Sequence, residues 1–164
     1  MPIYTLTLEG HRDVRNPSAN TVREAVMKLA EPDGPTYMIL KDSCGSYAQA
    51  GGTAGRYRAE CRDVFGEGFL HWMAASPICK DRTKTVVYYR NRCLENTHPH
   101  RRCPLQATEA NVLALSDVLA ILLEFLATGT RSAKYSWDDM TQEWVDRDRQ
   151  ERGDEEIGEI GPRA

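Results

Sequence analysis

Four residues in the second half of the chain have the types and the spacing of a metal site. Cys93, His98, His100 and Cys103 lie close together, and thiolate and imidazole are ligands that zinc prefers. Their spacing, Cys-x4-His-x-His-x2-Cys, lacks the second close pair that is typical of a structural zinc site. The surrounding stretch, 91–104, is polar and has no periodicity, which predicts a long loop. We therefore interpret the cysteines as incidental, and a zinc-binding module or enzyme is the alternative.

A row of arginines on one predicted strand is the second candidate. Residues 56–62 alternate, with small or aromatic residues at the odd positions and charged residues at the even positions. This period of two indicates an antiparallel strand with one buried face and one wet face. Solvent exposure alone explains the pattern most simply, but arginine and aromatic residues are also enriched at interface centres. The residues that would contact a partner are Tyr47, Gln49, Arg56, Arg58, Glu60 and Arg62.

Three further patterns have a simpler structural interpretation. His71 lies on a predicted strand without a recognisable nucleophile near it, so we interpret it as structural rather than catalytic. The glycine-rich stretch 51–55 lacks the Gly-Lys-Ser/Thr ending of a phosphate loop and predicts a loose turn. Asp138, Asp139 and Glu143 are interpreted as a solvated helix start, not as metal ligands. The sequence thus predicts a protein that is not an enzyme and needs no cofactor.

The elements that must position these residues are readable from periodicity. Alternation predicts a strand over 3–9, and Ser18 is expected to cap a helix over 22–29. A second, largely apolar helix is expected from Ser116, as its cap, to Gly129. The other predicted strands are 37–40, 47–50, 56–62, 69–74 and 85–89. Consecutive strands predict an α+β fold, a twisted antiparallel sheet of about five or six strands with two or three helices packed on one face.

Composition and charge limit the classes of function. The chain has 164 residues, 41% hydrophobic and 27% charged, with a net charge of -3. The acidic excess lies in the C-terminal tail, so we expect a single domain over 1–145 and a flexible tail over 146–164. The neutral body argues against direct nucleic-acid binding. The odd cysteine count, the absence of a signal peptide and the lack of a long apolar run predict a cytoplasmic protein that does not span a membrane.

Several stretches taken together resemble the Imm1 family of bacterial immunity proteins, which accompany polymorphic and contact-dependent toxins. They span most of residues 3–137, and no single one is diagnostic. The most specific is Phe125-x3-Gly129-x-Arg131-x5-Trp137. The others are Asn16-Pro17 with the helix after it, 37–40, 45–52, 58–60, Phe69-Leu70-His71-Trp72 and the apolar run from Asp117.

The resemblance implies an α+β fold and a role without catalysis. Such a protein binds a cognate toxin domain, often a nucleic-acid deaminase or nuclease, and blocks its active site in the producing cell. The 91–104 loop and the charged tail depart from the family pattern, which leaves the contact surface open. A small ligand-binding sensor is a further alternative, with a pocket between sheet and helices. Its lining would be Tyr57, Trp72, Tyr88 and Tyr89, whose ordinary role is core packing.

Overall fold

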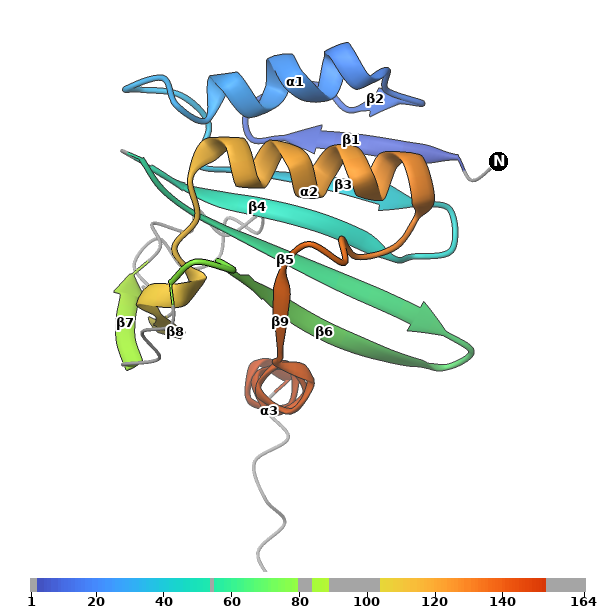
Figure 1. The fold of residues 1–164 in the computed structure, drawn as a ribbon. Helices are drawn as coiled ribbons and strands as arrows, with labels where there is room; N and C mark the ends of the chain where they lie inside the picture. Colours follow the sequence, from blue (N-terminus) through green and yellow to red (C-terminus); the bar gives the residue numbers. More distant parts are fainter. Residues whose placement is uncertain (1–2, 54, 80–83, 89–103, 153–164) are drawn as a thin grey trace, which may run out of the picture.

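The computed structural model describes residues 3–53, 55–79, 84–88 and 104–152. In these residues a main sheet of seven antiparallel strands has the order β2-β1-β3-β4-β5-β6-β9, and β7 and β8 form a separate pair (Figure 1). The strands are β1 (Tyr4–Leu8), β2 (Val14–Arg15), β3 (Tyr37–Asp42), β4 (Tyr47–Thr53), β5 (Arg56–Phe65), β6 (Gly68–Ala75), β7 (Lys84–Tyr88), β8 (Pro104–Thr108) and β9 (Ser136–Asp139). The helices are α1 (Ala19–Lys28), α2 (Leu115–Thr128), α3 (Thr141–Arg152) and a short 3-10 helix, η1 (Glu109–Asn111). The α+β class is confirmed, and the main sheet has more strands than expected.

Helices α1 and α2 lie side by side over one face of the main sheet (Figure 1). As predicted, α1 begins after Ser18, whose Oγ accepts a hydrogen bond from the Thr21 backbone N–H at 3.1 Å. A cap of this kind typically contributes about 1 kcal/mol. The buried residues of α1 recur at helical spacing: Val22, Ala25 and Val26. The buried residues of β1 alternate along the strand: Tyr4, Leu6 and Leu8.

Strands β3 to β6 follow one another as antiparallel hairpins. The turn after β3 is held by Asp42, whose Oδ1 accepts hydrogen bonds from the backbone N–H groups of Cys44 and Ser46. The loose turn predicted over 51–55 is wrong in extent, since β4 continues to Thr53. Gly52 has a φ of +136°, and a Cβ there would lie 2.2 Å from the Arg56 carbonyl oxygen. Close approach of two strands therefore explains this glycine.

Helix α2 has more buried residues than α1. Its first residue differs from the prediction. The expected cap at Ser116 is wrong, because α2 begins at Leu115 and Ser116 lies in the first turn. The Ala114 backbone N–H instead donates to Asp117 Oδ2 at 3.2 Å, so a side chain inside the helix satisfies the N-terminal donor. The predicted end at Gly129 is confirmed, with a left-handed φ of 72°.

The last turn of α2 is tied to β1 through a buried aromatic pair. The Tyr4 hydroxyl donates to the Phe125 carbonyl oxygen at 3.2 Å, and the two rings meet edge to face with centroids 5.9 Å apart. A Cβ at Gly129 would lie 3.3 Å from the same hydroxyl. The Phe125-x3-Gly129 spacing therefore closes α2 where it packs on β1.

The third helix lies apart from α1 and α2, near the β6 and β9 edge of the sheet (Figure 1). The helix start predicted at Asp138 and Asp139 is wrong, because both residues belong to β9, and only Glu143 lies in the first turn of α3. Helix α3 also continues past residue 146, where the flexible tail was expected to begin. Within the described part of the chain, no helix is long and apolar enough to cross a membrane.

Candidate functional site

The sheet face turned away from α1 and α2 gathers polar residues into two neighbouring rows. Residues that face each other across antiparallel strands project to the same side. One row crosses from β3 to β6 through Lys41, Tyr47, Arg62 and His71. The next row contains Ile39, Gln49, Glu60 and Met73. We call the polar members of these rows, with Arg58, the polar face: Lys41, Tyr47, Gln49, Arg58, Glu60, Arg62 and His71.

Glu60 is the centre of the polar face and is almost completely buried, with 2% of its surface exposed. Arg58 Nη2 lies 2.6 Å from Glu60 Oε1. Gln49 Nε2 donates to Oε2 at 2.7 Å, and His71 Nε2 lies 2.8 Å from the same oxygen. Both carboxylate oxygens thus have partners from three strands, as a buried charge requires.

Two opposing effects determine the charge state of Glu60. Burial alone raises the pKa of a carboxyl group, but the Arg58 charge and the contacts with His71 and Gln49 outweigh it and lower the pKa of Glu60 to about 2. Glu60 is therefore ionised at neutral pH. The arrangement is suited to holding side chains in position, whereas a general acid or base needs a pKa nearer to the working pH.

Arg62 lies beside this network and is held by aromatic rings. Its Cζ is 4.2 Å from the centre of the Phe69 ring, 5.0 Å from that of Trp144 and 5.2 Å from that of Tyr47. Such cation–π contacts are worth about 0.5–2 kcal/mol each, depending on burial. No carboxylate pairs with Arg62 in the described part of the chain, and its Nε is buried without a hydrogen-bond partner there. The sheet thus presents a half-buried guanidinium with a fixed orientation.

Helix α3 closes the polar face over His71. The Trp144 ring centre lies 4.4 Å from that of His71, and the Thr141 Oγ1 accepts the His71 backbone N–H at 2.9 Å. His71 is 0% exposed, and its Nδ1 has no partner among the residues that the structure describes. The His71 ring is therefore enclosed by Glu60 and Trp144, and its backbone is tied to the start of α3.

The predicted contact residues fall into two groups. Tyr47, Gln49, Arg58, Glu60 and Arg62 do come together on one face. Arg56 does not join them, because it is exposed and pairs with Glu109 of η1 at 3.1 Å. The wet face expected around Glu60 is wrong: the Arg58 and Glu60 side chains are only 12% and 3% exposed. The parts of the polar face open to a partner are therefore Lys41, Tyr47, Gln49 and Arg62.

Phe69, His71 and Trp144 were not predicted as members of this site. Phe69 and His71 are two residues apart on β6 and therefore project to the same face of the sheet. The alternation of side chains along the strand could have placed both of them on the polar face. Nothing in the sequence indicates that Trp144 lies against the ring of His71, from which it is 73 residues away along the chain. That contact depends on how α3 follows β9 in space.

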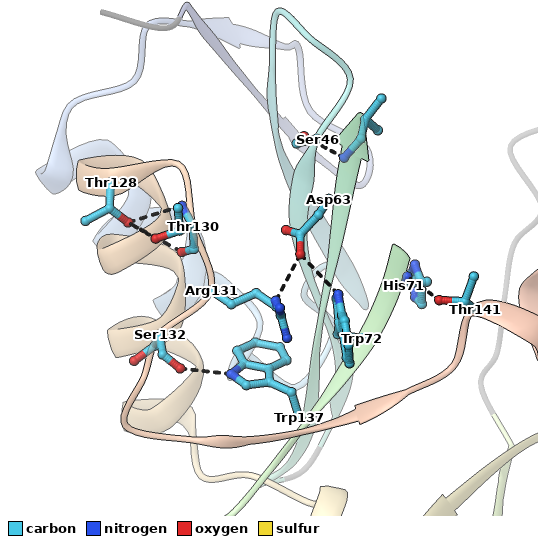
Figure 2. Close-up of polar contacts among 11 residues, drawn as sticks. Ser46, Asp63, His71, Trp72, Thr128, Thr130, Arg131, Ser132, Trp137 and Thr141 are labelled. Atoms are coloured by element: carbon cyan, nitrogen blue, oxygen red, sulfur yellow. Dashed lines mark hydrogen bonds and ion pairs between the residues drawn. The ribbon is translucent and has the colours of Figure 1, made fainter. Parts of the chain in front are cut away.

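A second cluster of polar and aromatic side chains lies on the opposite face of β5 and β6, away from the polar face. Asp63 Oδ2 accepts hydrogen bonds from Arg131 Nε and from Trp72 Nε1, both at 3.0 Å (Figure 2). The Arg131 Cζ lies 3.9 Å from the centre of the Trp72 ring and 5.9 Å from that of Trp137. A cavity of about 360 Å³ opens here, lined by Asp63, Thr130, Arg131, Ser132, Ala133 and Trp137. We call this the Arg131 cavity.

The residues expected to line a sensor pocket do not all meet. Trp72 touches Arg131 beside the cavity, whereas Tyr57 is 4% exposed and belongs to the core under α2. Tyr88 is in β7, where no side chain is described, and Tyr89 lies outside the described residues. The cavity is thus at the end of α2, not in the middle of the interface between sheet and helices.

The residues of the alternative zinc site, Cys93, His98, His100 and Cys103, lie outside the described residues. Among the residues that are described, no group of three or more histidine, cysteine or acidic side chains is arranged to hold a metal ion. Asp138, Asp139 and Glu143 are among these described residues. Cys61 is buried in the core, which raises the pKa of its thiol and makes it unreactive.

In comparisons with known proteins, the chain matches no family model, no curated protein and no solved structure. The resemblance to the Imm1 family therefore stays a prediction from the motifs. Three of the motif residues, Trp72, Arg131 and Trp137, do lie together in space although they come from β6, the loop after α2 and β9.

Proposed function

We propose that this protein is an immunity protein, which binds a cognate bacterial toxin domain and occludes its active site without catalysing a reaction. The observation that supports it best is Arg62, a guanidinium fixed by three aromatic rings on an accessible part of the sheet. Arginine and aromatic residues that are already ordered lose little entropy on binding, and they dominate the energetics of protein interfaces. The resemblance to immunity proteins supplies the class of partner.

The buried network under Arg62 supports a binding role over a catalytic one. Glu60, His71 and Arg58 are closed off by their neighbours and by α3, and Glu60 is fully ionised at neutral pH. Their effect is to fix the backbone and side chains of β4 to β6, on which Tyr47, Gln49 and Arg62 are placed. A rigid support of this kind is what a tight protein–protein contact requires.

The charge of the open part of the polar face indicates the chemistry of the partner. Lys41 is exposed one strand away from Tyr47, and neither Lys41 nor Arg62 has a carboxylate partner within the described residues. The toxin domain would meet this face with acidic side chains, and an interface of ordinary size would bury roughly 800 Å² on each partner. The toxin's own substrate is a nucleic acid, as the resemblance implies.

The test is co-expression with any toxin domain that is found encoded beside the gene, followed by affinity measurement. We expect growth of the host to be restored by this protein and purified toxin domain to bind it. Lys41→Glu changes only an exposed charge and is expected to weaken binding by more than tenfold, as is Arg62→Gln. Arg15→Gln, exposed on the far edge strand β2, is the matched control and should leave the affinity unchanged.

Two outcomes count against the proposal in different ways. Absence of both protection and binding would reject the immunity function. Protection with unchanged affinity in both the Lys41 and Arg62 variants would keep the function and move the contact surface away from the polar face. Thermal melting of each variant separates loss of binding from loss of fold.

A further inference from the structure

The Arg131 cavity lies on the face of β5 and β6 opposite Arg62, and the proposed toxin contact does not use it. Its residues come from three places in the sequence: Asp63 on β5, the 130–133 segment after α2, and Trp137 on β9 (Figure 2). Trp137 is itself fixed, because its Nε1 donates to the Ser132 carbonyl oxygen at 2.8 Å. A hydrogen bond within the protein therefore fixes the wall that Trp137 forms.

Arg131 is held by one edge of its guanidinium and leaves the other edge available. Asp63 binds Nε, and Trp72 stacks on the plane of the group at 3.9 Å. No hydrogen bond from either Nη atom is found within the described part of the chain, and 29% of the Arg131 side chain is exposed. A guanidinium oriented in this way presents two parallel N–H donors, the geometry that matches the two oxygens of a carboxylate.

We propose that the Arg131 cavity is a binding site for a small organic carboxylate. The carboxylate group pairs with the Nη edge of Arg131, and the rest of the molecule lies against Trp137 and Ala133. The cavity volume, about 360 Å³, is at the lower end of the range for small-molecule sites.

The neighbouring acid explains why a carboxylate fits better than a phosphate. Asp63 already contributes one negative charge next to the single cation of the site, and its side chain is 32% exposed to the same region. Asp63 and Arg131 together are neutral, so a singly charged ligand brings the site to a net charge of −1, whereas a doubly charged phosphate brings it to −2 and is repelled more strongly by Asp63. The carboxylate of Asp63 beside Arg131 therefore favours ligands with a single negative charge.

The indole N–H groups give a direct measurement. The chain has three tryptophans, of which Trp72 and Trp137 flank Arg131 and Trp144 lies on the other face, over His71. We would titrate the full-length, ¹⁵N-labelled protein with butyrate and, separately, with butyramide and inorganic phosphate. We expect butyrate to shift the indole signals of Trp72 and Trp137 and the Arg131 Nε–H signal saturably, and to leave Trp144 unmoved.

Arg131→Lys is the decisive variant, because it keeps the positive charge and removes the guanidinium group with its two parallel N–H donors. The butyrate affinity is expected to fall at least tenfold, while an unmoved Trp144 signal reports that the fold persists. Arg56→Lys, which alters an exposed arginine elsewhere, should bind as the unaltered protein does. Equal shifts with butyramide, shifts that never saturate, or saturation by phosphate in place of butyrate would overturn the proposal. None of these outcomes depends on whether the polar face binds a toxin.

Discussion

Two arginine–glutamate pairs formed by neighbouring positions of β5 have very different surroundings. Arg56 and Arg58 are two residues apart and share the parity of the same strand face. Arg56 Nη2 lies 3.1 Å from Glu109, with side chains 60% and 38% exposed. Arg58 Nη2 lies 2.6 Å from Glu60, with side chains 12% and 3% exposed. Both pairs join an arginine to a glutamate; they differ in burial, and Glu60 also contacts Gln49 and His71.

The difference teaches that burial, not pairing, determines what each pair contributes. Water and salt screen the Arg56–Glu109 pair, so its contribution is small. Water does not reach Glu60, so its charge depends on Arg58, Gln49 and His71, and the loss of any of these partners leaves a buried group unsatisfied. The buried pair therefore organises the polar face, and the exposed pair does not.

The largest effect is expected for Glu60→Gln, which removes the buried charge at nearly constant volume. Arg58 and His71 lose their anionic partner, and breaking a buried pair in this way typically costs about 3–5 kcal/mol. Urea unfolding followed by circular dichroism would measure the change in the free energy of unfolding. A change below about 1 kcal/mol would mean that solvent reaches Glu60 and that the contrast between the two pairs is wrong.

Acid should reveal how much the charge of Glu60 contributes to stability. The pKa of Glu60 in the folded protein, about 2, is below the ordinary value of 4.5, so folding favours the charged form. Its contribution is complete above pH 4.5 and is lost as the pH falls toward 2. By linkage this amounts to about 3 kcal/mol. Stability measured across this pH range should fall more steeply for the unaltered protein than for Glu60→Gln; parallel curves would contradict the assignment.

Much of the fold could be predicted from the sequence, because local periodicity decides it. The strand at Tyr4–Leu8, the cap at Ser18 and the end of α2 at Gly129 all depend on residues within one or two turns of each other. The start of α2 was predicted wrongly because two neighbouring residues can both accept a hydrogen bond from the first backbone N–H groups of a helix. Ser116 is a good cap, but Asp117 supplies the oxygen that the helix start uses.

The candidate site could be predicted only in part. The alternation of residue types along a strand indicates which face of the sheet a side chain is on, but not which other element covers that face. The even positions of β5 were correctly assigned to one face, and their exposure was not. The exposure of Arg62, one of these positions, depends on Trp144 of α3, which follows β9 and has no signal in the sequence of β5. Likewise, Arg131 and Trp72 are 59 residues apart along the chain, and only the fold brings them into contact.

Trp144→Ala tests whether the Trp144 ring keeps water away from His71 and the polar face around it. The ring contacts His71 and Arg62 and is itself half-buried, so we expect a loss of about 1–3 kcal/mol, less than for a fully buried tryptophan. Trp144→Phe keeps an aromatic ring and is the matched control. Hydrogen exchange of the His71 backbone N–H would report the opening directly. Unchanged protection in the alanine variant would show that Trp144 is not what encloses His71.

The smallest effect is expected at the exposed pair, and it is the strictest test of the comparison. Glu109→Gln makes the same chemical change as Glu60→Gln, yet we expect a loss of only about 0.2–1 kcal/mol, because water takes the place of the carboxylate around Arg56. A double-mutant cycle with Arg56→Ala isolates the pair from other effects of each substitution. Its coupling energy should shrink further in 1 M salt, where the Debye length is about 3 Å, whereas the Arg58–Glu60 coupling should not. Equal coupling energies with equal salt dependence would mean that the environment of β5 is uniform, and the argument that Glu60 is a buried organising charge would fail with it.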